Sequence, residues 1–230
     1  MSIPNSFDPI GSIDKIEYIC DGLILYFDAL FEEPGTRNYL TNWVSGTHCE
    51  FNNPIRATGA YITGASSVRA TFNEGLSQQI DGHSPVGMGY SADICAQQGG
   101  YIDFTVWSDT PNNMHLGFQW HHGPQGIRVR GALGPTKISP IISYSLQNGE
   151  KNSAHVDFDD HSSLRINGES VGSIINDNAG VGLATAGFGT SSAAAPADNV
   201  VLFAYRLYNR RLTIAEQKHN YSIDKKRFGL

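Results

Sequence analysis

Two Asn-Gly dipeptides, at residues 148–149 and 167–168, restrict the fold of this chain more than any other feature. Asn and Gly adopt positive φ angles easily, so the pair favours the type I′ turn that joins two neighbouring antiparallel strands. Strand-like runs flank both dipeptides, namely 141–147 and 153–159 around the first and 162–166 and 169–175 around the second. We therefore expect two β-hairpins in the third quarter of the chain.

Other segments also have the residue pattern of strands. Apolar and polar residues alternate in 101–108, 114–120 and 127–133, as in strands with one covered face. The runs 22–30 and 199–208 are apolar almost throughout, as in strands that are covered on both faces. Short strands with frequent turns predict an all-β fold, an antiparallel two-sheet jelly-roll sandwich.

The C-terminal residues have a different pattern, which is typical of a turn followed by one short helix. Thr213 and Glu216 form a T-x-x-E capping box that starts the helix. One side of this helix carries four residues: Ile214, Gln217, Tyr221 and Asp224. We expect Ile214, Tyr221 and Phe228 to pack against the sandwich, where the helix covers an open end or a sheet edge.

Length and charge limit the organisation and the partners of the chain. A β-sandwich of 230 residues is commonly one domain, so we expect an N-terminal arm or peripheral segment at 1–20 and a single domain at 21–230. The net charge of −6 argues against nucleic acid as a partner. The basic residues that cluster do so near the C-terminus, which we interpret as a solvated helix face: Arg210, Arg211, Lys218, Lys225, Lys226 and Arg227.

No signal peptide is expected at the N-terminus, because no long apolar run follows a cationic start. No stretch approaches the eighteen apolar residues of a membrane span, so we expect no membrane insertion. Cys20, Cys49 and Cys95 are an odd number of cysteines without C-x-x-C spacing. They are typical of reduced thiols in a protein made in the cytosol.

Three stretches of the chain resemble the laminin-G-like, concanavalin A-like jelly-roll superfamily. DGLILYFDAL (21–30) is similar to its opening strand, and HVDFDDHSSLRINGESVGS (155–173) to its signature hairpin with an acidic turn. NVVLFAYRLYNRRLTIAEQKHNY (199–221) is similar to its closing strand, turn and glutamate-containing helix. The final DKKRFGL (224–230) resembles tails of such domains in gut-bacterial and bacteriophage proteins. The resemblance implies the sandwich with one short C-terminal helix, in a superfamily of lectins, adhesins, glycosidases and structural modules.

Catalytic residues are not evident in the sequence. Glycosidases of the superfamily use two glutamates and an aspartate in close alternation, so that two carboxyl groups flank the scissile bond. The only close pair of glutamates here, Glu32 and Glu33, is adjacent and points to opposite faces of a strand. No Ser-His-Asp or Cys-His arrangement is apparent either. We therefore expect a protein that is not an enzyme.

Aromatic side chains beside polar groups are the candidates for binding a sugar. Trp107 shares a strand face with Asp103 and Thr105, although a large aromatic residue in a sandwich is often covered by the facing sheet. The full set of candidate ligand-binding residues is Trp107, Asp103, Trp43, Tyr90, His121 and His122. His121 and His122 would share a metal ion only at a bend, such as one at Gly123-Pro124, and a polar turn is the alternative interpretation.

The acidic turn of the second hairpin is a candidate metal site. Asp157, Asp159 and Asp160 offer the oxygen ligands that calcium prefers. The acidic turn of the superfamily accounts for the same residues without an ion. We therefore expect no cofactor, with Ca²⁺ as the alternative.

The hypothesis that joins these observations is a non-enzymatic binding or structural module. The resemblance of the C-terminal tail favours a bacteriophage virion protein, a capsid, collar or tail decoration that is made in the host cytoplasm. Its partners would be other virion proteins or further copies of the chain. If it also has a role in adhesion, a cell-surface glycan is a further partner. The alternatives are a carbohydrate-binding module of a bacterial surface protein, located at the cell surface or in the cytoplasm, and a divergent glycosidase.

Overall fold

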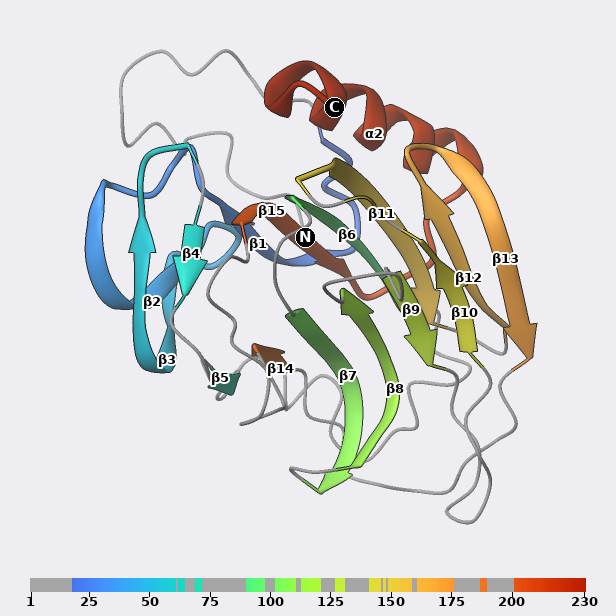
Figure 1. Cartoon of the computed structure of the whole chain (residues 1–230), viewed down its shortest axis with the longest axis horizontal. Coiled ribbons are helices and arrows are strands. Elements are labelled where there is room, and N and C mark those ends of the chain that lie inside the picture. Colours follow the sequence, from blue (N-terminus) through green and yellow to red (C-terminus); the bar gives the residue numbers. More distant parts are fainter. Residues whose placement is uncertain are drawn as a thin grey trace.

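A computed structural model gives the architecture of the chain (Figure 1). It describes residues 18–60, 62–64, 69–71, 90–97, 102–110, 113–120, 127–130, 141–145, 147, 149–158, 161–175, 187–189 and 201–230. These residues form two antiparallel β-sheets and one C-terminal helix, as the sequence predicts.

The first sheet, sheet A, contains the first and the last strand of the described chain. Its central strand β15 (Val201–Tyr208) pairs with β6 on one side and with β1 and β4 on the other. The other strands of sheet A are β1 (Leu23–Asp28), β2 (Gly35–Asn42), β3 (Thr47–Ala57), β4 (Ile62–Gly64), β6 (Tyr90–Gln97), β11 (Lys151–Phe158), β12 (His161–Ile166) and β13 (Glu169–Ile175).

The second sheet, sheet B, is joined to sheet A by β3. This long strand pairs with β2 and β4 in sheet A and, at Phe51, with β5 in sheet B. The strands of sheet B are β5 (Arg69–Thr71), β7 (Ile102–Thr110), β8 (Asn113–Trp120), β9 (Ile127–Arg130), β10 (Ile141–Tyr144) and β14 (Gly187–Gly189).

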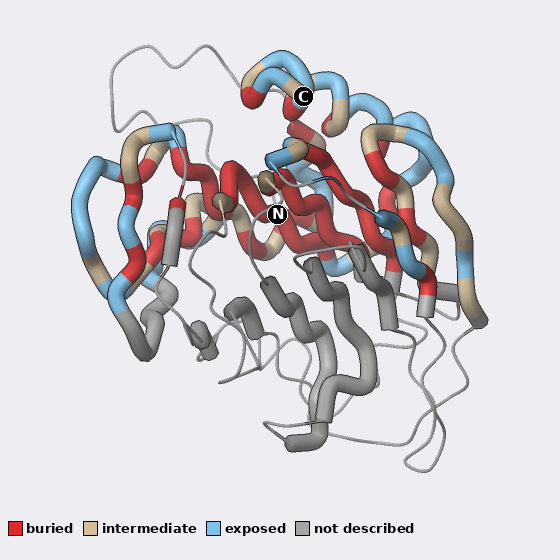
Figure 2. The backbone as a smooth tube through the Cα atoms, in the orientation of Figure 1, coloured by how far each residue is buried: buried red, intermediate tan, exposed pale blue. Residues whose placement is uncertain are grey.

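The inner face of sheet A is apolar because its strand register aligns apolar residues across five strands. Side chains directly opposite one another on paired strands lie on the same face of the sheet. The first aligned row is Phe27, Tyr205, Ile94, Ala154 and Ile166. The second is Leu25, Leu207, Ala92, Val156 and Leu164. All ten side chains are buried, which makes these rows the core of the described sandwich (Figure 2).

Helix α2 (Ile214–Phe228) forms a third layer on the outer face of sheet A (Figure 1). The predicted capping box is confirmed: the Thr213 hydroxyl accepts a hydrogen bond from the Glu216 backbone N–H, and the Glu216 carboxylate accepts one from the Thr213 N–H. The helix ends at Gly229, which adopts the left-handed conformation with φ 67°.

The position and the buried face of α2 differ from the expectation. The helix does not cover a sheet edge, since its residues contact β1, β15, β6 and β11 on the face of sheet A. Ile214 is 54% exposed, so its predicted packing is wrong. Phe228 is buried as predicted, beside three polar residues of the same face, Gln217, Asn220 and Asp224. The helix turns its polar residues toward sheet A because the polar rows of the sheet offer them hydrogen-bond partners. The side chain of an isoleucine cannot form such hydrogen bonds.

The two Asn-Gly dipeptides have different outcomes. Asn167 and Gly168 have φ angles of 52° and 82° and join β12 to β13 in a paired hairpin, which confirms the second prediction. Gly149 also has a positive φ, 80°, but β10 before it pairs with β9 whereas β11 after it pairs with β6 and β12. The predicted first hairpin is therefore wrong: this turn carries the chain from sheet B to sheet A.

The described residues at the start of the chain are held against the helix. Tyr18 is buried, and the backbone N–H of Ile19 donates to the Asn220 side chain. Cys20 is an exposed free thiol and Cys95 a buried one. Within the described parts of the chain, no helix has the length and apolar character that crossing a membrane requires.

The two glycines of the Asn-Gly turns provide a matched test of the packing of α2. A Cβ at Gly168 would lie 3.0 Å from Cδ1 of Tyr221 on α2, whereas no described atom lies within 4 Å of a Cβ at Gly149. The positive φ alone makes Gly149→Ala cost about 1–2 kcal/mol of unfolding free energy. Gly168→Ala should cost about 1–3 kcal/mol more, because the methyl group also overpacks against Tyr221. Urea unfolding of both variants measures the difference, and equal losses would mean that Tyr221 does not pack on this turn.

Candidate functional site

Charged and polar side chains gather on the outer face of sheet A, beneath α2. The strand register that aligns the apolar rows also aligns polar residues at the alternate positions. One row is Tyr26, Arg206, Asp93, His155 and Arg165, and the next is Tyr208, Ser91, Asp157 and Ser163. We name the network that they form with α2 the subhelical network, comprising Arg206, Asp93, His155, Asp157, Ser153, Tyr18, Asn220 and Asp224.

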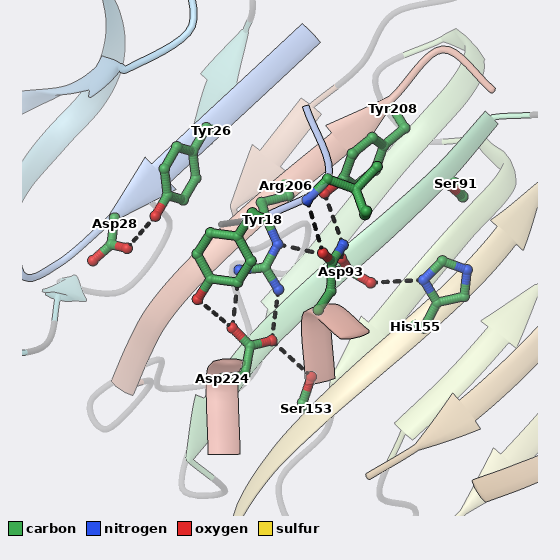
Figure 3. Close-up of polar contacts among 12 residues, drawn as sticks. Tyr18, Tyr26, Asp28, Ser91, Asp93, Ser153, His155, Arg206, Tyr208 and Asp224 are labelled. Atoms are coloured by element: carbon green, nitrogen blue, oxygen red, sulfur yellow. Dashed lines mark hydrogen bonds and ion pairs between the residues drawn. The ribbon is translucent and has the colours of Figure 1, made fainter. Parts of the chain in front are cut away.

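Arg206 is the centre of the subhelical network (Figure 3). Its side chain has no solvent exposure, and two of its nitrogens donate to the two carboxylate oxygens of Asp224 on α2, at 2.9 and 2.5 Å. Its Nε donates to Asp93 Oδ2 on β6 at 3.2 Å. The guanidinium carbon lies 4.0 Å from the centroid of the Tyr18 ring. Burial lowers the pKa of Arg206, but the surrounding carboxylates raise this pKa by more than burial lowers it. Arg206 therefore stays charged.

The Asp224 carboxylate is fully used by these contacts. It also accepts hydrogen bonds from the Tyr18 hydroxyl at 2.7 Å and from the Ser153 hydroxyl on β11 at 3.0 Å. Four separate segments of the chain therefore meet at this single carboxylate: the N-terminal segment, β11, β15 and α2.

His155 lies between two carboxylates and is positively charged. Its Nδ1 donates to Asp93 at 2.6 Å and its Nε2 donates to Asp157 at 3.1 Å. Burial lowers the pKa of His155, but the hydrogen bonds to Asp157 and Asp93 outweigh this effect and raise it to about 9. Burial raises the pKa of Asp93, but Arg206, His155 and Asn220 together lower it to about 2.

The charges of the subhelical network are balanced when Arg211, which lies beside it, is included. Asp157 accepts from Ser163 Oγ at 2.5 Å, and the exposed Arg211 lies 3.3 Å from it. The three carboxylates, Asp93, Asp157 and Asp224, are thus matched by His155, Arg206 and Arg211. A carboxylate that a cation already neutralises is less available to a metal ion or a substrate.

A second buried ion pair and a row of aromatic rings continue the outer face toward β1. Arg227 of α2 donates to Asp28 at 2.6 Å, and Tyr26 donates to the same oxygen at 2.5 Å. Burial raises the pKa of Asp28 despite this pairing. Edge-to-face contacts link the rings of Tyr18, Tyr26, Phe31 and Trp43. The C-terminal end of α2 is therefore fixed by charge and by aromatic packing together.

Trp43 is the predicted ligand-binding residue whose side chain the structure describes. It lies in the turn after β2, half-buried, with its ring centroid 5.6 Å from that of Phe31. Its indole N–H is buried and has no hydrogen-bond partner among the described residues. The residue is only half-buried, so Trp43 stays a candidate for ligand binding.

The other predicted ligand-binding residues are placed only by their backbone or not at all. Asp103 and Trp107 lie in β7, where the pairing with β8 is irregular on both sides of Trp107. Tyr90 begins β6. The side chains of these three residues, and both His121 and His122, lie outside the described part. Their roles therefore remain predictions.

Of the three residues of the predicted metal site, the structure describes Asp157, whereas Asp159 and Asp160 lie outside the described residues. Its carboxylate is engaged by His155, Ser163 and Arg211, as described above. In the described ranges, no three His, Cys, Asp or Glu side chains gather so as to hold a metal ion. The calcium site stays a prediction that now depends on the two aspartates of the turn.

One accessible aromatic group was not singled out from the sequence. On the β2–β3 hairpin, the rings of Tyr39 and His48 are stacked 4.0 Å apart at an interplanar angle of 11°. The Arg37 guanidinium lies 5.4 Å from the Tyr39 centroid and is itself held by Glu32. His48 is exposed and Tyr39 half-buried. A stack of this kind offers the flat ring surface and nearby polar groups that sugars bind.

Comparisons with known proteins show the fold. No protein-family model matches the chain, and no curated protein sequence matches it. Trypanosoma rangeli sialidase in complex with sialic acid is similar over 89% of this chain and 33% of its own, with a TM-score of 0.61 and 12% identity. The binding domain of botulinum neurotoxin DC in complex with SialylT is similar over 89% and 52%, with a TM-score of 0.60 and 12% identity. The chain thus spans a third to a half of these solved chains and shares their fold.

The charge of His155 makes the stability of the fold dependent on pH. The folded protein keeps the proton on His155 up to pH about 9, whereas the unfolded chain releases it near 6.5. The stabilisation is therefore complete below pH 6.5 and is lost as the pH rises toward 9. Between pH 6.5 and 8.5 the free energy of unfolding should fall by about 2–3 kcal/mol. Urea unfolding at several pH values measures the slope.

The matched variant is His155→Gln, which keeps a polar side chain but does not titrate. It should be less stable than the wild type at pH 6, and its stability should be nearly constant from pH 6.5 to 8.5. The same slope in both proteins would show that His155 is not the group responsible.

Proposed function

We propose that this chain is a non-enzymatic, glycan-binding β-sandwich module. The observation that carries the proposal is the shared fold along nearly nine-tenths of the chain with proteins solved in complex with sialic acid and SialylT. A further support is the accessible Tyr39–His48 stack on the β2–β3 hairpin. Trp43, Trp107 and Asp103 are additional candidate contacts on the grounds given above.

The charges of the described residues favour binding over catalysis. General acid–base catalysis by two carboxyl groups needs at least one of them free to exchange a proton with the substrate. The buried carboxylates of Asp93, Asp157 and Asp224 are held by cations, and Glu32 accepts from Arg37 and from the Thr41 backbone. The sialidase comparison covers only a third of that enzyme, so its activity does not carry over to this chain.

The setting of the module is a finer proposal. We place it on a bacteriophage virion, as a capsid, collar or tail decoration that contacts other virion proteins or its own copies. The support is the resemblance of the C-terminal tail to those of phage and gut-bacterial domains. Mass spectrometry of purified particles tests this setting, and absence of the protein from them would favour a bacterial surface protein instead.

A glycan array tests binding itself. The wild-type protein should bind a restricted set of glycans, and titration then gives the affinity for the strongest one. Replacing the exposed His48 by Ala should weaken that affinity about tenfold, which corresponds to ~1.4 kcal/mol of lost stacking. The neighbouring exposed Thr47→Ala is the matched control and should bind as the wild type does.

The outcomes separate the parts of the proposal. Silence across sialylated and neutral glycans would reject the binding function. Binding that is unchanged in His48→Ala would move the sugar away from the β2–β3 hairpin, and Trp107→Ala would then be the next variant. Release of free sugar from a bound sialylated glycan would contradict the non-enzymatic assignment.

A further inference from the structure

The positive charge of this acidic protein is concentrated in its last strand and helix. Residues 206–230 contain seven of its 16 Lys and Arg but only two of its 22 Asp and Glu. The preceding part therefore has a formal charge of −11, and this segment has one of +5. Such an asymmetry is uncommon for an ordinary solvated helix, whose exposed face usually mixes both signs.

The structure pairs both acidic residues of this segment with arginines. Asp224 is buried against Arg206, as described above. Glu216 is held by two nitrogens of Arg210, at 3.1 and 2.6 Å, and by the cap at Thr213. These contacts lower the pKa of Glu216 to about 2, with Arg210 as the main cause. Outside these two pairs, the exposed charges of α2 and its preceding turn are all positive.

We name the exposed basic residues the basic ridge, comprising Lys218, Lys225, Lys226 and Arg211, of which Arg211 also pairs with the buried Asp157. Lys218 and Lys225 are seven positions apart, so they lie on one face of the helix about 10 Å apart along its axis. At the C-terminal end of α2, Lys151 of β11 adds a further ammonium group 3.0 Å from the Phe228 carbonyl. The ridge therefore extends along the whole helix.

The helix dipole accounts for only part of the ridge. Lys225 and Lys226 lie in the last turn, where positive charge is favourable. Arg211 precedes the helix and Lys218 lies in its second turn, where the dipole gives no such benefit. Arg211 is accounted for by its pairing with Asp157. Lys218 is therefore the exposed charge of the four that neither the dipole nor an ion pair explains, and binding of an anion explains it.

The ridge has a rigid support. The subhelical network and the Arg227–Asp28 pair fix α2 to sheet A along its length. Lysine ammonium groups on flexible stems act as point charges that tolerate several arrangements of an anionic partner. A fixed row of such charges suits an extended polymer with repeated negative groups better than one compact ligand.

We infer that the basic ridge is a second binding surface, and that its partner is an acidic glycan with repeated carboxylates. The inference rests on the proposed function for the glycan class, since sialic acid and SialylT, the ligands of the structures that share this fold, carry carboxylates. The acidic remainder of the chain repels a polyanion, so a bound polymer is confined to the ridge. The ridge then selects acidic glycans from neutral ones.

Polysialic acid is the probe that tests the inference, with dextran as the neutral polymer. Wild-type protein should bind immobilised polysialic acid, and the affinity should fall steeply between about 50 mM and about 200 mM salt. Lys218→Gln, Lys225→Gln and Lys226→Gln combined should weaken binding at least about tenfold. The three side chains are exposed, so the thermal midpoint of this variant should fall by no more than about a few degrees, through the lost dipole interactions of Lys225 and Lys226.

Two control variants separate the ridge from net charge. Replacing the same three lysines by Arg keeps the charge and should keep the binding. Arg56→Gln removes an exposed positive charge on β3, outside the ridge, and should leave the affinity for polysialic acid within about twofold of the wild type.

Each result has a definite meaning. Wild-type binding to polysialic acid that survives in the triple Gln variant overturns the ridge but keeps the glycan function. Binding of the wild type to neutral glycans but not to polysialic acid would also overturn the ridge and keep the glycan function. Equal binding to double-stranded DNA would overturn the glycan assignment of the ridge in favour of any polyanion. Silence toward all glycans rejects the proposed function itself.

Discussion

The buried charge of Arg206 is the constraint on which the rest of the outer layer depends. A guanidinium without solvent exposure is tolerated only when carboxylates neutralise it and accept its hydrogen bonds. Asp93 meets this requirement within sheet A, because the register places it directly opposite Arg206. Asp224 meets it from α2, where the observed placement of the helix brings its carboxylate to both terminal nitrogens. One side chain thus fixes the register of two strands and the position of the helix.

The subhelical network specifies the fold more than it adds to stability. A buried ionic network is often no more stabilising than well-packed apolar side chains, since desolvation offsets much of the attraction. The apolar rows on the inner face of sheet A supply the burial that drives folding. The network determines where α2 lies, and α2 in turn presents its lysines to solvent. The glycan-binding function proposed for the ridge therefore depends on buried residues that touch no ligand.

The sequence predicted those features that local chemistry decides. The central apolar strand β15, the Thr213–Glu216 cap and the Asn167-Gly168 hairpin depend on neighbouring residues alone, and all three are present. The turn at Gly149 has the expected backbone, but the partners of β10 and β11 depend on the packing of the whole sandwich.

Alternation assigns charged residues such as Asp93 and His155 to a solvent-exposed face, so the sequence did not reveal a polar face that a helix covers. The sequence does contain one sign of this covered polar face, since Arg206 is a lone charged residue inside the apolar strand β15. The side chains of Asp103 and Trp107 lie outside the described part, so their predicted roles stand as before.

The stability of an Arg206→Met variant tests the central claim most directly. Removing the guanidinium leaves Asp93 and Asp224 buried without their common partner, which should cost about 3–5 kcal/mol of unfolding free energy. Arg210→Met removes a partly exposed arginine from the neighbouring pair with Glu216 and should cost less than about 1 kcal/mol. Urea unfolding of both variants gives the comparison, with hydrogen exchange showing whether α2 amides lose protection in the first variant alone. Equal, small losses in the two proteins would contradict the account, because α2 would then be held by something other than Arg206.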